Sequence, residues 1–165
     1  MTTTAISFSP LRHLANSLAL LLQRPPRRQV AALCYRRRKG KTEVLLVTTR
    51  NTKRWILPKG WPGARRSAAK TATIEAYEEA GIIGEVANRP LGEYRSQKGL
   101  GNGFTVRTAV TVFPLKVSKQ VSDFPESGER KQRWLTPEQA AELCGDEGLR
   151  DILLSPKAKS LLMAA

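Results

Sequence analysis

The chain has 165 residues, of which 41% are hydrophobic, so it is long enough for one domain with a buried core. Its 28 Lys and Arg residues outnumber 14 Asp and Glu residues and give a formal net charge of +14 at pH 7. That charge indicates an anionic partner: a phosphorylated small molecule, a nucleic acid or an acidic membrane surface. The single histidine, His13, disfavours a zinc site and a histidine-based catalytic triad. Catalysis would therefore depend on carboxylates, basic side chains and a bound metal.

The positive charge is concentrated in the first quarter of the chain. Residues 1–42 carry nine basic residues and no acidic one. The apolar run at 14–22 is too short to span a bilayer, and the consecutive prolines at 25–26 cannot continue a helix. We predict a basic leader or appended helix with a linker over residues 1–28, and one domain over residues 29–165. A transit peptide and a membrane-resting helix stay open for the leader. The predicted location is therefore cytoplasmic, with an organellar or membrane-peripheral location as the alternative.

The domain begins with patterns that are typical of β-strands. Residues 30–35 form an apolar run that predicts a buried strand, and residues 42–49 predict its partner across a turn at 36–41. The two cysteines, Cys34 and Cys144, lie in apolar contexts and form no metal-binding spacing. We predict that both are reduced and buried.

A central helix is predicted between two capping residues. Ser67 is a good N-cap and Gly81 a natural C-cap, so the helix should run to Ala80. Beyond it, the patterns predict a bent strand at 82–96, a glycine-rich loop at 97–103 and a long strand at 104–117. A short last strand at 132–135 is followed by a helix from residue 136 onward and by a second helix at 149–162 that is interrupted before a proline. Strands on both sides of one helix, with more helix at the end, predict an α/β (α+β) sandwich.

Three carboxylates stand out on the central helix. Glu75, Glu78 and Glu79 are spaced i, i+3 and i+4, which places them on one helical face. Like charges in this arrangement repel by roughly a few tenths of a kcal/mol per pair, so a joint use is expected. The simplest use is to bind hard divalent cations through oxygen ligands. The alternative is a solvated acidic helix face, although acids near a helix C-terminus are unfavourable with the macrodipole.

Gly60 and residues 75–82 together resemble the Nudix box. The family pattern of a glycine followed by Glu-x-x-Glu-Glu-x-Gly-apolar fits them without a gap. Two positions depart from it, because Arg66 stands where the first Glu is expected and Ile74 where an Arg is expected. Around the box, the chain is most similar to the diphosphoinositol polyphosphate and diadenosine polyphosphate hydrolase branch, at residues 31–35, 44–47, 54–58 and 129–134.

The resemblance implies a Nudix-type α/β/α sandwich with a mixed central sheet. It also implies a Mg²⁺-dependent (or Mn²⁺-dependent) attack of water on a phosphoanhydride. Glu75, Glu78 and Glu79 would be the catalytic residues and, with the carbonyl of Gly60, the metal ligands. Which glutamate is the general base stays open. Ile74 cannot donate a side-chain hydrogen bond, so the carboxylates would have to be oriented by another residue.

Basic residues around the box are candidates for binding a polyphosphate, because arginine presents paired donors to phosphate oxygens. Surface lysines and arginines are common, so only part of this set is expected to contact a ligand. Lys59 is the strongest candidate because it adjoins Gly60. The predicted substrate-binding residues are Arg28, Arg50, Lys53, Arg54, Lys59, Arg66, Arg130 and Lys131.

The predicted function is that of a metal-dependent hydrolase. It would cleave a phosphoanhydride in a dinucleoside polyphosphate, a diphosphoinositol polyphosphate or a related nucleoside-diphosphate derivative. The alternative is a non-catalytic polyanion-binding or RNA-binding module on a Nudix fold. An anionic small molecule is the expected partner, with nucleic acid less favoured and membrane contact possible through the leader. The sequence does not indicate an oligomeric state.

Overall fold

The computed structural model describes residues 26–99 and 105–164. The predicted leader, apart from its last three residues, and most of the predicted glycine-rich loop lie outside these residues. The strands and helices in chain order are β1 Arg27–Arg38, β2 Lys41–Thr48, β3 Trp55–Ile56, β4 Lys59–Gly60, α2 Ala68–Ala80, β5 Ile82–Val86, β6 Gly92–Gly99, β7 Thr105–Gln120, β8 Gln132–Leu135, α3 Pro137–Leu143, α4 Glu147–Leu154 and α5 Pro156–Met163. Of the helices in the described part, none is long and apolar enough to cross a membrane.

The strands form one mixed sheet of eight strands in the described part, with β1 and β7 at its centre. These two strands run parallel, from Arg27 opposite Thr108 to Tyr35 opposite Lys116. Every other pairing is antiparallel. The free edge of β7 is shared by β6 and β5, and that of β1 by β4 and β2. The mixed sheet and the α+β class predicted from the sequence are confirmed.

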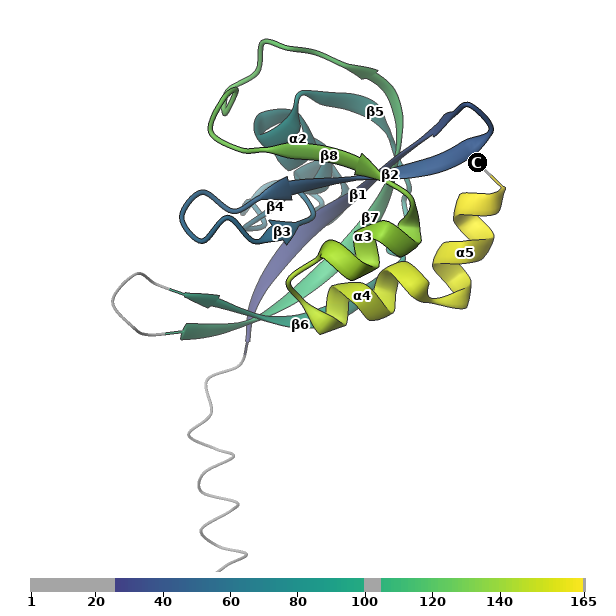
Figure 1. Ribbon diagram of the computed structural model, residues 1–165. Coiled ribbons are helices and arrows are strands. Elements are labelled where there is room, and N and C mark those ends of the chain that lie inside the picture. Colours follow the sequence, from purple (N-terminus) through teal and green to yellow (C-terminus); the bar gives the residue numbers. More distant parts are fainter. Residues whose placement is uncertain (1–25, 100–104, 165) are drawn as a thin grey trace, which may run out of the picture.

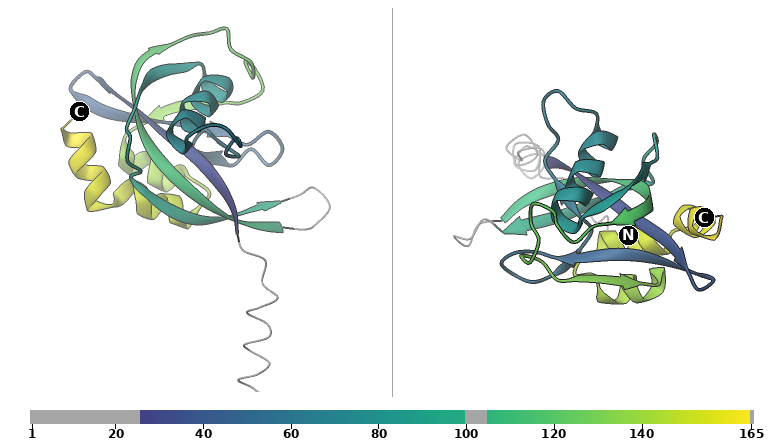
Figure 2. Two further views of the ribbon diagram at one scale, coloured as in Figure 1. Left: turned by 180° about the vertical axis from the view of Figure 1, so that it is seen from behind. Right: turned by 90° about the horizontal axis from the view of Figure 1, so that it is seen from above.

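Alternation along β1 builds a core on each face of the sheet. Ala31 and Leu33 belong to the cluster that contains residues of α3, α4 and α5. Val30, Ala32 and Cys34 belong to the cluster that contains residues of α2. A strand that is buried on both faces reads as a continuous apolar run, as residues 30–35 do. The helices therefore cover opposite faces of the sheet, as the two views in Figure 2 show.

The β1–β2 hairpin has a shorter turn than the six residues predicted at 36–41. Only Lys39 and Gly40 lie between the strands, with φ of 49° and 75°. Two successive residues with positive φ are typical of the tight turn that matches the twist of a hairpin. Arg36 can therefore stay in the ladder opposite Glu43, with which it forms an ion pair of 2.8 Å. The hairpin projects beyond the centre of the sheet near α5 (Figure 1).

Both predicted caps of α2 are confirmed. The Ser67 side chain accepts a hydrogen bond from the backbone N–H of Lys70, and Gly81 closes the helix with φ of 67°. Between them, Ala72, Ala76 and Ala80 are fully buried against the sheet. These small side chains let the helix lie close to the strands. The caps thus fix both the length of α2 and the positions of its three glutamates.

The later elements follow the predictions with shifted limits. The predicted strand at 82–96 is bent into β5 and β6, which pair with different parts of β7. The long strand β7 continues to Gln120, three residues further than predicted. The last predicted helix is divided at Ser155, which ends α4 and caps α5 just before Pro156. Both cysteines are free and buried, as predicted.

Candidate active site

The candidate site lies where the two-residue strand β4 meets α2. Lys59 and Gly60 pair with Ala31 and Val30 at the start of the central strand β1. The backbone of Gly60 lies directly against the carboxylate of Glu75, so a Cβ at this position would overlap with it. Position 60 therefore requires glycine, because the backbone and the Glu75 carboxylate lie so close together. The pairing of β4 with β1 fixes this backbone in the sheet.

Glu79 is the most enclosed of the three glutamates, with 6% of its side chain exposed. Its Oε2 accepts a hydrogen bond of 3.2 Å from the backbone N–H of Lys59, and its Oε1 accepts one from the guanidinium of Arg130. Burial raises the pKa of Glu79 to about 7, which the charge of Arg130 and the Lys59 N–H oppose only in part. Burial, and then the charge of Glu78, also raises the pKa of Glu75.

The carboxylates of Glu75 and Glu79 beside β4 fit a cation such as Mg²⁺ that takes only part of its ligands from the protein. Within residues 26–99 and 105–164, the side-chain carboxylates of Glu75 and Glu78 accept no hydrogen bond and form no ion pair, so their oxygens are available to a cation. No three carboxylate, imidazole or thiolate side chains of these residues converge on one point. Mg²⁺ is commonly held by one or two carboxylates, with water and substrate phosphates as its other ligands.

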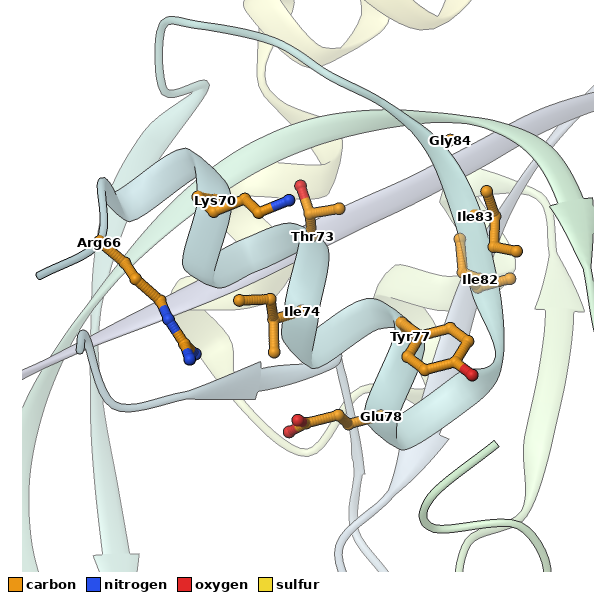
Figure 3. A pocket seen from close by; sticks show the side chains of 9 residues that line it. All are labelled: Arg66, Lys70, Thr73, Ile74, Tyr77, Glu78, Ile82, Ile83 and Gly84. Atoms are coloured by element: carbon orange, nitrogen blue, oxygen red, sulfur yellow. The ribbon is translucent and has the colours of Figure 1, made fainter. Parts of the chain in front are cut away.

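Both departures from the Nudix box line a groove of about 460 Å³ between α2 and β5. Arg66, Ile74 and Glu78 line it together with Tyr77 and Ile83 (Figure 3). Ile74 contributes only hydrocarbon there. Arg66 therefore lies on the groove side of α2, and Glu79 on the side that faces β4.

A chain of alternating charges leads from Glu79 to the surface. Arg130, whose side chain is 9% exposed, bridges Glu79 and Glu126, and its Nε lies 2.7 Å from Glu126. Arg50 bridges Glu126 and Glu129, and its Nε lies 2.8 Å from Glu129. Glu126 and Glu129 were not among the predicted site residues. Their only signal was two carboxylates in the polar connection before β8, and their pairing depends on the fold.

The structure brings part of the predicted substrate-binding set close to Glu79. Arg50, Arg130 and Lys131 gather at the end of β2, where the backbone of Lys131 bonds to Thr48. The side chain of Lys59 is held by the buried Gln29, whose side-chain oxygen accepts a 2.7 Å hydrogen bond from the ammonium group.

The other predicted basic residues lie elsewhere. Arg54 donates a 3.4 Å hydrogen bond to the Gln97 carbonyl on β6. Arg28 is exposed at the start of β1, and Lys53 is exposed beside β3 with φ of 53°. Arg66 lines the groove between α2 and β5. The role of each of these residues stays a prediction.

A comparison with known families identifies the fold and the box. The profile of the NUDIX domain matches residues 25–155. The chain belongs to the Nudix family. The match includes β4, α2 and the connection that carries Arg130, so the candidate site lies within the family domain.

Curated relatives include several Nudix hydrolases. "Nudix hydrolase 12, mitochondrial" of Arabidopsis thaliana is 35% identical over 117 residues, which cover 69% of this chain and 58% of the relative. "Nudix hydrolase 21, chloroplastic" of the same plant is 34% identical over 133 residues, which cover 77% of this chain and 64% of the relative. The mouse diphosphoinositol polyphosphate phosphohydrolase 3-alpha is 28% identical and is covered to 68%. The chain thus spans less than two thirds of the length of the first plant relatives.

Solved structures share the Nudix fold. A C. elegans Ap4A hydrolase aligns with a TM-score of 0.60 at 18% identity, covering 84% of this chain and 99% of that one. The NUDIX domain of Shewanella oneidensis NrtR, in a complex with ADP ribose, aligns with a TM-score of 0.61 at 16% identity, covering 94% of this chain and 99% of the other. At these identities the likeness supports the architecture alone.

Proposed function

We propose that this chain is a divalent-cation-dependent hydrolase of a phosphoanhydride bond. The observation that supports the proposal best is the contact between the Glu75 carboxylate and the backbone of Gly60, with Glu79 bonded to the neighbouring Lys59 N–H. These contacts join the two halves of the Nudix box into one site. Named relatives of the chain are hydrolases.

The residues of the candidate site have two expected roles, cation binding and phosphate binding. Glu75, Glu78, Glu79 and the Gly60 carbonyl would hold one or more Mg²⁺ or Mn²⁺ ions, and each ion would take one or two of these carboxylates and complete its ligands with water and substrate phosphates. When bound, such a cation neutralises charge on phosphate oxygens and makes a coordinated water more acidic. Phosphoryl chemistry needs mainly positioning and charge neutralisation, so Lys and Arg side chains supply the remaining requirement. Arg50 and Lys131, near the end of β2, would contact the polyphosphate.

The proposed substrate is a highly charged nucleotide or inositol derivative. Dinucleoside polyphosphates, diphosphoinositol polyphosphates and related nucleoside-diphosphate derivatives all present several phosphates to basic groups. The net charge of +14 supports this class over a neutral substrate. The likeness to a diphosphoinositol polyphosphate phosphohydrolase places inositol pyrophosphates in the panel beside dinucleotides.

A substrate panel with Mg²⁺ or Mn²⁺ tests the proposal. It should contain diadenosine polyphosphates, diphosphoinositol phosphates, ADP-ribose and nucleoside triphosphates, with identification of the products. We expect turnover of at least one substrate, lost in EDTA and reduced in Glu78→Gln and Glu79→Gln. Glu142→Gln, on the exposed side of α3, is the matched control. No turnover by the wild type on the whole panel would reject the hydrolase.

The alternative function, a polyanion-binding module, has its own supporting feature. Arg37, Arg38, Lys39 and Lys41 are exposed around the β1–β2 turn, with no acidic residue among them. Binding to nucleic acid through phosphates alone would weaken steeply with salt and would not depend on sequence. RNA binding that is lost in a Lys39→Ala/Lys41→Ala variant, together with no turnover, would favour this module.

Residues 1–28 bear on location. Cytoplasmic location stays the proposal, and the names of plant relatives as mitochondrial or chloroplastic proteins support the organellar alternative. Cell fractionation of the full chain and of a chain without residues 1–25 would separate the two. Lipid co-sedimentation of the same pair tests membrane contact, and binding that is unchanged by the deletion would reject it.

A further inference from the structure

Glu79 depends on a residue outside the Nudix box for its side-chain partner. Among the described residues, Arg130 is the only one whose side chain bonds to it, and the second bond comes from a backbone N–H of β4. Position 74, where the box normally carries an arginine, holds an isoleucine that lines the groove between α2 and β5. The orientation of Glu79 is therefore set from the connection between β7 and β8.

Arg130 is itself held in place by groups other than Glu79. Its Nε donates to Glu126 at 2.7 Å, and its Nη1 donates to the Thr48 carbonyl at 3.0 Å. All three nitrogens of the guanidinium are thus engaged, and the side chain is 9% exposed. A side chain that is fixed at two other points is preorganised to hold a third group.

The connection between β7 and β8, which carries Arg130, is hydrogen-bonded to both α2 and β2. The backbone N–H of Glu126 donates to the Glu78 carbonyl at the end of α2, at 3.0 Å. The backbone of Lys131 exchanges hydrogen bonds with Thr48 at the end of β2. Arg130 therefore lies on a segment whose backbone is bonded to both α2 and β2, and the fold defines its position relative to Glu79.

The bonds to Glu79 leave room for a cation. Its Oε1 accepts from Arg130 and its Oε2 from the Lys59 N–H. A carboxylate has about four acceptor positions, two on each oxygen, so about half remain open. Arg130 can orient the group without occupying the positions that a cation needs.

We propose that Arg130 is a positioning residue for this chain, which holds Glu79 in the orientation required for divalent-cation binding in place of an arginine at position 74. The inference rests on the proposed function and assigns Arg130 to the carboxylate rather than to the substrate phosphates. Partners of a metal ligand typically contribute about 10-fold to 100-fold in cation affinity or activity. The effect should appear first in cation binding and kcat.

Binding and kinetics of Arg130 variants test the inference. The variants are Arg130→Met, which keeps much of the length without donors, and Arg130→Lys, which keeps the charge but has all its donors on one nitrogen instead of spread over a planar guanidinium. Arg89→Met, on the exposed connection between β5 and β6, is the control for loss of one positive charge. Mn²⁺ affinity would be measured by electron paramagnetic resonance, and kcat and KM on the best substrate of the panel.

We expect Arg130→Met to weaken Mn²⁺ binding and kcat by about 10-fold to 100-fold, with KM within about threefold of the wild type. Arg130→Lys should lie between the two proteins, and Arg89→Met should match the wild type. A raised KM with unchanged Mn²⁺ affinity would overturn the inference in favour of a phosphate ligand. Tighter Mn²⁺ binding in Arg130→Met would overturn it too, because Arg130 would then compete with the cation.

Two further comparisons keep the outcomes separate. Should Arg130→Met not fold, as shown by circular dichroism, Glu126→Gln loosens Arg130 without removing it and should give a smaller loss of Mn²⁺ affinity; an unchanged affinity would overturn the inference. A wild type without turnover rejects the proposed hydrolase, while the Mn²⁺ affinities still decide the role of Arg130. A wild type that binds no Mn²⁺ overturns both.

Discussion

Replacing Glu79 by glutamine should change how the stability of the protein depends on pH. Burial raises the pKa of Glu79 from 4.5 to about 7 in the folded chain. The folded state then binds more protons than the unfolded state between these values, so stability falls as pH rises through this window and levels off above it. The glutamine variant has no carboxyl group to titrate. In that variant Arg130 loses its bond to Glu79 at every pH and keeps its ion pair with Glu126, which adds an offset that does not vary with pH.

The size of the effect follows from the difference in pKa. One pKa unit corresponds to about 1.4 kcal/mol, so the whole window represents about 3 kcal/mol. Most of it, about 2–3 kcal/mol, falls between pH 5 and pH 8. Only 6% of the Glu79 side chain is exposed, so solvent screening reduces the value little.

Urea unfolding in EDTA at several pH values between 5 and 8 measures the effect. The free energy of unfolding of the wild type, minus that of Glu79→Gln, should fall by about 2–3 kcal/mol over this range. Glu142→Gln controls for the loss of a carboxylate from the surface. Parallel profiles for the wild type and Glu79→Gln would refute the reasoning, because they would mean that the attraction of Arg130 fully offsets burial.

Three substitutions test the packing that supports the site. Gly60→Ala should displace the Glu75 carboxylate and lower Mn²⁺ affinity at least about 10-fold, and unchanged affinity would show that this contact is dispensable. Gly81→Ala places a Cβ at φ of 67° against the Val121 carbonyl and should cost about 1–3 kcal/mol in urea unfolding, whereas equal stability would contradict the steric argument. Leu33→Ala removes a fully buried side chain and should cost about 2–5 kcal/mol, and a loss below about 1 kcal/mol would mean that the core closes around the cavity.

The sequence predicted the elements whose limits are set locally. Ser67 and Gly81 cap α2 through bonds to its own backbone, so both limits were correct. The break before Pro156 was also predicted, since a proline lacks the backbone donor that a continuous helix needs. The hairpin turn at 36–41 was predicted too long, because ladder pairing and an ion pair with Glu43 on the opposite strand keep Arg36 in β1.

Features that depend on distant pairing were not accessible from the pattern. The two-residue strand β4 has no periodicity of its own and exists through its pairing with β1. The parallel pairing of β1 with β7 joins segments separated by a large part of the chain. The bond between Arg130 and Glu79 likewise joins residues 51 positions apart. The three glutamates were selected by their spacing, whereas Arg130, which bonds to one of them, was predicted to bind phosphate.

The two thiols lie in different layers of the molecule, and this makes them separate reporters of local opening. Cys34 lies in the cluster beneath α2, and Cys144 in the cluster beneath the terminal helices. Burial raises the pKa of both, so neither forms the reactive thiolate readily in the folded state. An alkylating reagent would modify each cysteine only when its own layer separates from the sheet. Mass spectrometry of the two cysteine peptides would then show which side of the domain comes apart first, without any added label.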